Sequence, residues 1–341
     1  MSNCIIGTSA SESADPALLK QAHIGWIRQD FDIPFVDGVG GQLSDKYVRS
    51  KEQARRWVAQ GFRMMGVSHG LGIGTYKPDA TGQMAFHWQS ELPDWYGEPG
   101  SDAFMANYQA VCRFLADDLR GIVDLWQIAN ELDIPLFVGP LSVTQAAKLL
   151  ESGARGLKEG NPAALVGPNM GGIQRGYYLY GRLYRDASDV LDYVGIDGYL
   201  GTWEPGPPQL WSERIALLHE LTGKPVLINE WGFASRGEVL REGELPSGAP
   251  LCQSRKWQFS WGDGHTPAGQ AAFVREAFRA FAKQKAHLMG LFFYRWEDQS
   301  HCWQCGAPDC PIETAWGLVD LHGAPKPSFT AFREGVEMLV G

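Results

Sequence analysis

Two glutamates stand where short apolar runs of the sequence stop, and each follows an asparagine. Glu131 ends the run Trp126-Gln-Ile-Ala-Asn-Glu, and Glu230 ends the run Val226-Leu-Ile-Asn-Glu. A lone glutamate after a strand is most often a helix cap or a solvated loop residue. Two glutamates in matching contexts indicate a carboxyl pair, in which one group can hold a proton while the other stays ionised. Such a pair can supply a general acid/base and a nucleophile to one reaction.

Apolar runs alternate with amphipathic stretches from one end of the chain to the other. The sequence predicts strands over residues 4–8, 26–33, 62–68, 124–129, 164–168, 194–199, 225–229 and 287–294. It predicts helices over residues 15–23, 46–60, 103–119, 144–158, a Tyr-rich stretch after 168, 209–221, 269–285 and 328–339. Several of the predicted strands are continuously apolar, as expected of parallel strands that are covered on both faces.

Eight strand–helix units without a second compositional block predict one α/β domain over residues 1–341. The expected fold is a single (β/α)8 TIM barrel with elaborated loops at the C-terminal face of its strands. A doubly wound open sheet is the rival, but the first strand-to-helix turn, residues 7–13, lacks a GxGxxG fingerprint. In a barrel, Glu131 on the fourth strand and Glu230 on the seventh face the same mouth.

With these residues in place, the chain resembles clan A of the retaining glycoside hydrolases, which includes families five and thirty-nine. The resemblance covers the whole chain in strand order and is specific at Asn130-Glu131 and Glu230-Trp-Gly. It implies that Glu131 is the acid/base and Glu230 the nucleophile of a double displacement through a covalent glycosyl-enzyme. The two carboxyl groups should then lie about 5–5.5 Å apart. Catalysis of this kind requires no cofactor.

The resemblance also implies supporting residues at other strand ends. Arg28 on the second strand and Tyr199 after the sixth would hold the nucleophile, and Asn130 would contact the sugar 2-hydroxyl. A surface salt bridge for Arg28 and a packed aromatic for Tyr199 are the alternatives. Trp296, after the eighth strand, matches the clan's platform beneath the reacting sugar. The neighbouring Glu297 could bind outer hydroxyls or be an ordinary loop acid.

Further candidates rest on their positions alone. His69 closes the third strand, but a lone histidine is more often structural than catalytic. Six tryptophans fall in the predicted long loops, where some should line sugar subsites: Trp88, Trp95, Trp203, Trp257, Trp261 and Trp303.

Four cysteines fall in the loops after the seventh and eighth predicted strands. Cys302, Cys305 and Cys310 lie within nine positions and include a CxxC pair, and Cys252 is in the neighbouring loop. This pattern is typical of a tetrahedral structural zinc site, which leaves no open position for catalysis. A disulfide in an oxidising compartment and free thiols are the alternatives.

Composition excludes several function classes. The 341 residues carry 39 acidic and 30 basic side chains, a formal net charge of −9, so no binding to nucleic acid is expected. No apolar run approaches the length of a membrane span, so no membrane association is expected. The N-terminus has no basic region followed by a long apolar run, so the expected compartment is the cytoplasm, although a trimmed secreted protein would look the same. The sequence carries no indication of oligomeric state.

The sequence thus predicts a retaining β-glycosidase that acts on a carbohydrate substrate. A cytoplasmic location favours exo action on short oligosaccharides or glycosides, and an endo-acting β-glucanase or β-mannanase of the same clan is the alternative. A catalytically inactive carbohydrate-binding barrel is a different class, against which Glu131, Glu230, Arg28 and Tyr199 together argue. A metal-dependent hydrolase would need clustered histidine and aspartate ligands at strand ends, and the sequence has no HxH motif.

Overall fold

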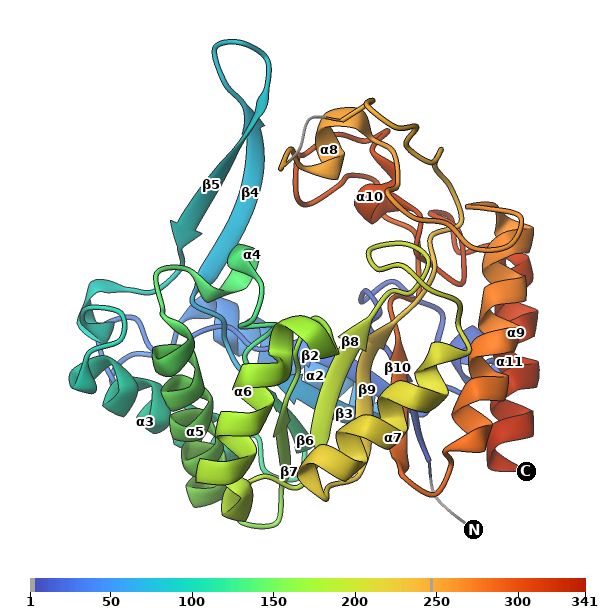
Figure 1. Ribbon diagram of the computed structural model, residues 1–341. Coiled ribbons are helices and arrows are strands. Elements are labelled where there is room, and N and C mark those ends of the chain that lie inside the picture. The colour runs from blue at the N-terminus through green and yellow to red at the C-terminus, as the bar shows by residue number, and fades with distance from the viewer. Residues whose placement is uncertain (1–3, 246–247) are drawn as a thin grey trace.

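The computed structural model describes residues 4–245 and 248–341, and its centre is an eight-stranded parallel sheet in the order β7-β6-β3-β2-β1-β10-β9-β8 (Figure 1). The strands are β1 (Ile5–Thr8), β2 (Trp26–Asp30), β3 (Arg63–Val67), β6 (Val123–Ile128), β7 (Leu165–Pro168), β8 (Val194–Gly198), β9 (Val226–Trp231) and β10 (Leu288–Phe293). The helices that follow them are α1 (Pro16–Gln21), α2 (Asp45–Ala59), α3 (Asp102–Asp118), α5 (Val143–Gly160), α6 (Ile173–Asp186), α7 (Leu210–Thr222), α9 (Pro267–Lys283) and α11 (Pro327–Val340).

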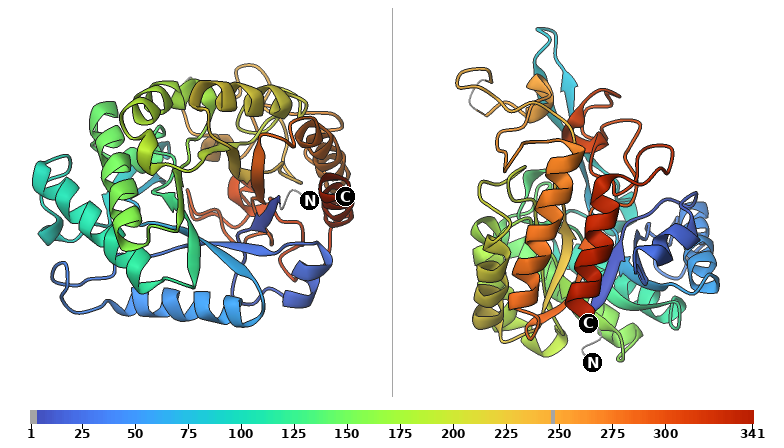
Figure 2. Two further views of the ribbon diagram at one scale, coloured as in Figure 1. Left: turned by 90° about the horizontal axis from the view of Figure 1, so that it is seen from below. Right: turned by 90° about the vertical axis from the view of Figure 1, so that its right-hand side faces the viewer.

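The sheet curls until its edge strands, β7 and β8, meet. Across this seam the backbone N–H of Asp192 donates to the oxygen of Val166, and that of Asp197 donates to the oxygen of Met170, both at 2.8 Å. Viewed along the barrel, the helices surround the strands as a ring (Figure 2). The predicted (β/α)8 barrel is therefore confirmed, with differences of a few residues at the ends of the elements.

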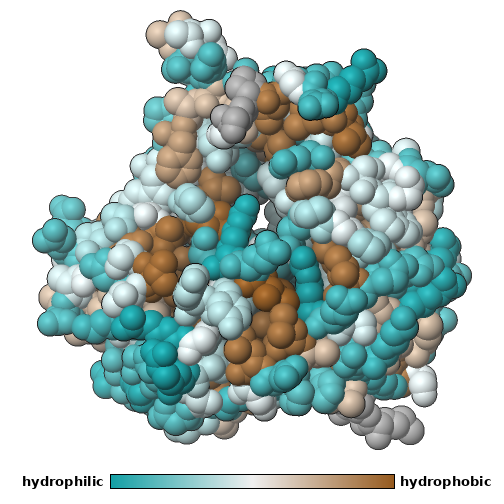
Figure 3. All heavy atoms as spheres, viewed as in Figure 1, coloured by the Kyte–Doolittle hydropathy of each residue, from teal (hydrophilic) through white to brown (hydrophobic). Residues whose placement is uncertain are grey.

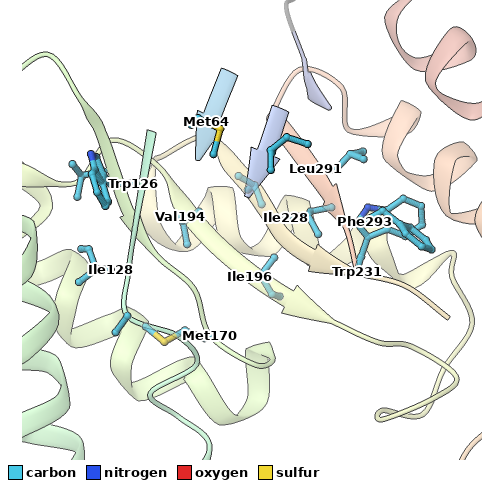
Figure 4. Close-up of a cluster of buried hydrophobic side chains, with 14 of the residues drawn as sticks. Met64, Trp126, Ile128, Met170, Val194, Ile196, Ile228, Trp231, Leu291 and Phe293 are labelled. Carbon is cyan, nitrogen blue, oxygen red and sulfur yellow. The ribbon is translucent and has the colours of Figure 1, made fainter. Parts of the chain in front are cut away.

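Alternation along the strands divides the apolar side chains between two layers. The larger layer packs between the sheet and the helices and includes Trp126, Val194 and Ile228 (Figure 4). A smaller cluster fills the barrel interior near the amino ends of the strands: Ile5, Trp26, Met65, Leu125, Tyr193, Leu227 and Phe292. These buried side chains fill the amino end of the barrel, and the cavity described below opens at the carboxyl ends of the strands.

Two residues further along three of these strands, the interior becomes polar. Arg28, Gln127 and Asn229 are all buried there. The Gln127 side-chain oxygen accepts hydrogen bonds from Arg28 Nε at 3.2 Å and from Asn229 Nδ2 at 2.9 Å. Buried polar groups need such partners, and this network forms the floor of the site described below.

Side-chain caps fix where several helices begin. Ser44, Ser101 and Thr266 each accept a hydrogen bond from a backbone N–H in the first turn of α2, α3 and α9. Ser142 and Gln145 form a reciprocal capping box at the start of α5. These caps satisfy backbone donors that the helix itself leaves unpaired.

The loops contain elements that the sequence did not predict. Strands β4 (Gly72–Pro78) and β5 (Met84–Ser90) form an antiparallel hairpin that projects above the barrel (Figure 1). Short helices α4 (Pro135–Val138), α8 (Leu251–Ser254) and α10 (Pro311–Thr314) and 3-10 turns at Asp94–Tyr96 and Ser188–Val190 lie in other connections. Among the described residues, no helix combines the length and apolar character needed to cross a membrane.

Candidate active site

A cavity of about 1520 Å³ opens at the carboxyl ends of the barrel strands. On the face shown in Figure 3, hydrophilic side chains surround a hollow below the hairpin and the α8 segment. The lining includes most of the predicted site residues: Arg28, His69, Asn130, Glu131, Tyr199 and Glu230. The structure therefore brings together both glutamates and the three residues expected to support them.

Glu230 lies near the end of β9 with donors on both of its carboxylate oxygens. Arg28 Nη2 is 2.7 Å from Oε1, and the Tyr199 hydroxyl donates to Oε2. Burial and the charge of Glu230 raise the pKa of Tyr199 well above its usual value, so this hydroxyl keeps its proton. Two donors on one carboxylate fix its plane and suit a group that carries negative charge.

The chain bends sharply where β6 delivers Glu131 to the cavity. Ala129 and Glu131 both have positive φ angles, 52° and 43°. The Ala129 N–H donates to Ser68 Oγ at 2.9 Å, and the Glu131 N–H donates to Asn169 Oδ1 at 3.0 Å. Residues other than glycine rarely adopt this conformation, and it persists where neighbouring groups hold it, often at functional sites.

The Glu131 side chain differs from Glu230 in its surroundings. Burial raises the pKa of Glu131 well above the usual glutamate value, and the negative charges of Glu230 and Asp133 raise it further. Arg28 acts in the opposite direction but is the weaker influence. The raised pKa favours the protonated form of Glu131, which is the form that a general acid needs.

Asn130 has a side chain whose orientation is set by its neighbours. Its oxygen accepts hydrogen bonds from Arg28 Nη2 at 3.0 Å, Gln127 Nε2 at 3.0 Å and Asn169 Nδ2 at 2.9 Å. An amide oxygen with three donors cannot be exchanged for the nitrogen. Asn130 Nδ2 consequently faces the cavity, 3.4 Å from Glu131 Oε2.

Asp197 is a buried carboxyl group beneath the site that the sequence analysis did not single out. Its side chain has no exposed surface, and Asn169 Nδ2 donates to its Oδ2. Burial raises the pKa of Asp197 well above its usual value, as do the neighbouring carboxyl groups of Glu230 and Glu131. One signal was present in the sequence: Asp197 is an acid inside an apolar run, two positions before Tyr199 and therefore on the same face of the strand.

His69 lies in the cavity wall, as its position at a strand end suggested. Its ring is buried, and its Nε2 shares a hydrogen bond with the Tyr96 hydroxyl. Burial lowers the pKa of His69 to about 3, so the imidazole is neutral at physiological pH. His69 can offer a hydrogen bond to a ligand but no positive charge.

Two predicted site residues after β10 do not line the cavity. Trp296 is 2% exposed and packs against Phe329 in the core, so it cannot lie beneath a bound sugar. Glu297 accepts a hydrogen bond from the Ser11 N–H at 2.7 Å and holds the loop after β1 instead. The aromatic side chain from this strand end that lines the cavity is Tyr294.

The loop tryptophans divide between the cavity and the packing around it. Trp203 and Trp303 line the main cavity, and Trp88 lines a second cavity of about 570 Å³ beside the hairpin. Trp257 is buried in a cluster with Trp316, whereas Trp95 and Trp261 pack against the main core. Only part of the predicted set is therefore placed to meet a ligand.

The four predicted cysteines converge on one point beside this cavity. The sulfurs of Cys252, Cys302, Cys305 and Cys310 all lie within 4.8 Å of one another. Three of these side chains are buried and that of Cys305 is partly exposed.

Comparisons with known proteins match the fold but not the sequence. No protein-family model and no curated protein matches the chain. Among solved structures, a GH10 xylanase from Thermobacillus composti superposes with a TM-score of 0.65 at 14% identity, over 98% of this chain and 97% of that one. A GH53 catalytic domain from Ignisphaera aggregans gives 0.62 at 19% identity, over 96% and 91% of the two chains.

A β-glycosidase from Thermosphaera aggregans gives a TM-score of 0.59 at 14% identity, over 95% of this chain and 84% of that one. All of these similarities span nearly the whole barrel described here. At such low identity they establish a shared architecture, and the chemistry has to be argued from the residues of this chain.

Proposed function

We propose that the protein hydrolyses a β-glycosidic bond with net retention of configuration. The observation that carries this proposal is the pair of glutamates in one cavity with unlike surroundings. Glu230 has a cation and a hydroxyl on its oxygens, whereas Glu131 is buried with a raised pKa. Retaining glycosidases need such a division between an ionised nucleophile and a protonated acid. The resemblance of the strand-end motifs to clan A supports the same assignment.

In the first step, a Glu230 oxygen forms a bond to the anomeric carbon while the bond to the leaving oxygen breaks. Glu131 gives its proton to that oxygen, so the aglycone departs as a neutral alcohol. In the second step, Glu131 takes a proton from water, whose oxygen attacks the anomeric carbon and displaces Glu230. Both carboxyl groups return to their starting states, and no cofactor enters either step.

Two further side chains suit contacts to the reacting sugar. Asn130 Nδ2 carries two hydrogens, of which one is directed at Glu131 Oε2, so the other can bind a ring hydroxyl. We assign the platform beneath the sugar to Tyr294, since it lines the cavity in the place expected of Trp296. An aromatic ring covers the apolar C–H face of a pyranose, while the ring hydroxyls find polar partners around it.

The rim supports exo action on a terminal sugar. The Tyr76 N–H of β4 donates to the Gln304 oxygen at 2.7 Å, and the Met84 N–H of β5 donates to Gln253 Oε1 at 2.6 Å. The hairpin is thus bonded to the loops on the other side of the mouth. A bridge across this end of the cavity favours entry of the end of a short oligosaccharide or glycoside over passage of a polysaccharide chain.

The test is product stereochemistry. A panel of nitrophenyl β-glycosides identifies an accepted sugar, and NMR then follows the anomer released first from that substrate. Retention, with loss of turnover in Glu230→Gln, is expected. Release of the inverted anomer, or no turnover and no sugar binding across the panel, contradicts the proposal. With oligosaccharides, stepwise release of single terminal sugars supports exo action, and internal cleavage would indicate the endo alternative.

A further inference from the structure

The cysteine cluster has distances that distinguish between pairing and metal binding. Cys252 Sγ lies 3.9 Å from Cys302 Sγ and 3.9 Å from Cys310 Sγ. A disulfide needs two sulfurs about 2.05 Å apart. Four sulfurs each about 2.3 Å from a central Zn²⁺ would lie about 3.8 Å from one another in a tetrahedron. Both of these separations are close to the edge of a zinc tetrathiolate, and all four sulfurs lie within 4.8 Å of one another.

The surroundings of the cluster also suit an enclosed metal. Cys302 and Cys310 have no exposed surface and Cys252 is 1% exposed. The CxxC segment forms a tight turn, in which the Gly306 N–H donates to the Cys302 oxygen at 2.7 Å and the Cys302 N–H donates to the Ala307 oxygen at 3.0 Å. Such a turn directs the two cysteines of the CxxC pair toward one point.

We propose that Cys252, Cys302, Cys305 and Cys310 bind one Zn²⁺ as a structural site. Each thiol loses its proton to solvent on binding, because the thiolate is the ligand. Four protein ligands complete the tetrahedral coordination of zinc and leave no position for water or substrate, so the metal takes no part in the chemistry. Its function is to hold together two long loops.

Those loops have little regular structure of their own. Residues 232–266 follow β9 and residues 294–326 follow β10, and among the described residues of each (246 and 247 are not described) the one regular element is a four-residue helix, α8 or α10. Loops of this length without internal secondary structure are uncommon in compact domains. A metal that takes Cys252 from one loop and three ligands from the other joins them directly.

The same loops form a wall of the cavity. Gln304 lies between the ligands Cys302 and Cys305, and its Nε2 donates to Glu313 Oε1 at 2.6 Å. The Tyr294 hydroxyl donates to Glu313 Oε2 at 3.3 Å. Tyr294, Gln304 and Glu313 all line the cavity. The zinc site thereby positions the side chains that would contact substrate beyond the catalytic pair.

The experiment is metal analysis of the full chain purified in metal-free buffer with mild reductant. Elemental analysis should find about one zinc per chain that survives dialysis. Cys305→Ser replaces the ligand that is least buried and should retain less than about a tenth of this zinc. Cys112→Ser changes a buried thiol outside the cluster and is the matched control, expected to keep its zinc. Thiols counted in denaturant with chelator should include all six cysteines.

A second readout is thermal stability, which does not depend on any catalytic activity. Treating the protein with a strong chelator should lower the melting temperature by more than about 5 °C, and returning Zn²⁺ should restore it. The same treatment should leave the melting temperature of Cys305→Ser unchanged, because this variant has already lost the metal. Should Cys305→Ser not fold, chelation and return of zinc to the wild-type chain give the same answer.

Three results would overturn the proposal. One is a folded wild-type chain with zinc below about a tenth of an equivalent and all thiols free. Another is a pair of cysteines missing from the thiol count, which would indicate a disulfide. The third is iron in place of zinc, since four thiolates also bind iron. Because zinc content is measured without substrate, failure of the glycosidase proposal leaves this one standing, and the reverse also holds.

Discussion

At the residue scale, Glu131 and Glu230 are the same side-chain type with different neighbours, and the two proposed roles follow from that difference. Glu230 accepts from Arg28 and Tyr199, which hold both oxygens in place. The Glu131 N–H donates to Asn169, and the pKa of the Glu131 carboxyl group is raised, mainly by burial. Such a difference in surroundings allows one carboxyl group to be protonated and the other ionised at the same pH.

Removing the Glu131 carboxyl group should therefore affect substrates according to their leaving group. In Glu131→Ala, turnover of alkyl glycosides should fall by about 10²–10⁴-fold, the usual contribution of proton transfer. Nitrophenolates leave without a proton, so the first step with nitrophenyl glycosides should be affected least. Azide needs no general base, so it should attack the glycosyl-enzyme and restore turnover of these substrates. The product should be a glycosyl azide of retained configuration. Glu220→Ala on the exposed face of α7 is the control, and equal losses with both substrate types would contradict the role of Glu131.

Arg28 should matter to both stability and catalysis. Its guanidinium and the Glu230 carboxylate are only 6% and 10% exposed. Arg28→Ala leaves that carboxylate buried without its cation, with the Tyr199 hydroxyl as its remaining donor, which should reduce the free energy of unfolding by about 3–5 kcal/mol and abolish most turnover. Arg28→Lys keeps the positive charge but loses the planar donors that reach Gln127, Asn130 and Glu230. This variant should be more stable than Arg28→Ala, but its kcat/KM should still be low. Urea titration and kcat/KM measure the two effects, and a full-activity Arg28→Ala would contradict them.

Strand-end positions predicted which residues would meet, but not every side chain that faces the ligand. Glu131, Glu230 and Arg28 could be placed because parallel strands deliver their carboxyl ends to one face. Trp296 was misplaced because the chain turns after β10, where the Trp296 N–H donates to the Ser9 oxygen and the indole enters the core. A turn of this kind depends on contacts between distant segments, which a single sequence does not reveal.

At the element scale, the burial of a strand decides whether it can be recognised in the sequence. Strands such as β8 and β9 are buried along their whole length and appear in the sequence as apolar runs. The β4–β5 hairpin is mostly exposed or half-buried and lies outside the barrel, so its sequence has no continuous apolar run. Its strands pair with each other and contribute to the rim rather than to the core.

Helices α3 and α5 pack so closely at Gly156 that alanine at this position should destabilise the protein, although helix propensity alone would predict stabilisation. A β-carbon on Gly156 of α5 would lie 2.2 Å from the Gln109 backbone oxygen of α3. Propensity favours alanine over glycine in a helix by about 0.5–1 kcal/mol. Close packing should outweigh this, so Gly156→Ala should be destabilised by about 1–3 kcal/mol.

Gly181 of α6 is the matched control for this substitution, since no atom lies within 4 Å of its added β-carbon. Gly181→Ala should follow propensity and gain about 0.5–1 kcal/mol. Chemical denaturation of both variants measures the difference. Stabilisation of Gly156→Ala to the same extent would mean that α3 and α5 are not packed this closely.

At the scale of the whole molecule, buried carboxyl groups near the site should make stability depend on pH. Burial raises the pKa of Asp133 to about 6, and burial together with neighbouring carboxyl groups raises the pKa values of Glu131 and Asp197 well above their usual range. A carboxyl group with a raised pKa in the folded state favours folding below its unfolded value, near 4. That contribution to stability is lost as the pH rises through the folded pKa. Above it the folded protein holds a buried carboxylate, whereas the unfolded chain exposes the same charge to water.

Glu131→Gln removes one of these groups while keeping its shape. The melting temperature of this variant should equal that of the wild type near pH 4 and exceed it increasingly as the pH is raised to about 8. Parallel melting curves across this range provide the measurement. A difference that stays constant, or that favours the wild type at high pH, would show that the Glu131 carboxyl group does not hold its proton as described.

The central claim is that Glu230 becomes covalently bound to the sugar. The most direct measurement is incubation with 2-deoxy-2-fluoro β-glycosides that carry good leaving groups, followed by intact mass and peptide mapping. A single fluorosugar attached to the peptide at Glu230, released when a sugar acceptor is added, is the predicted result. A label on any other residue would contradict it. So would inverting turnover of the parent glycoside with no adduct.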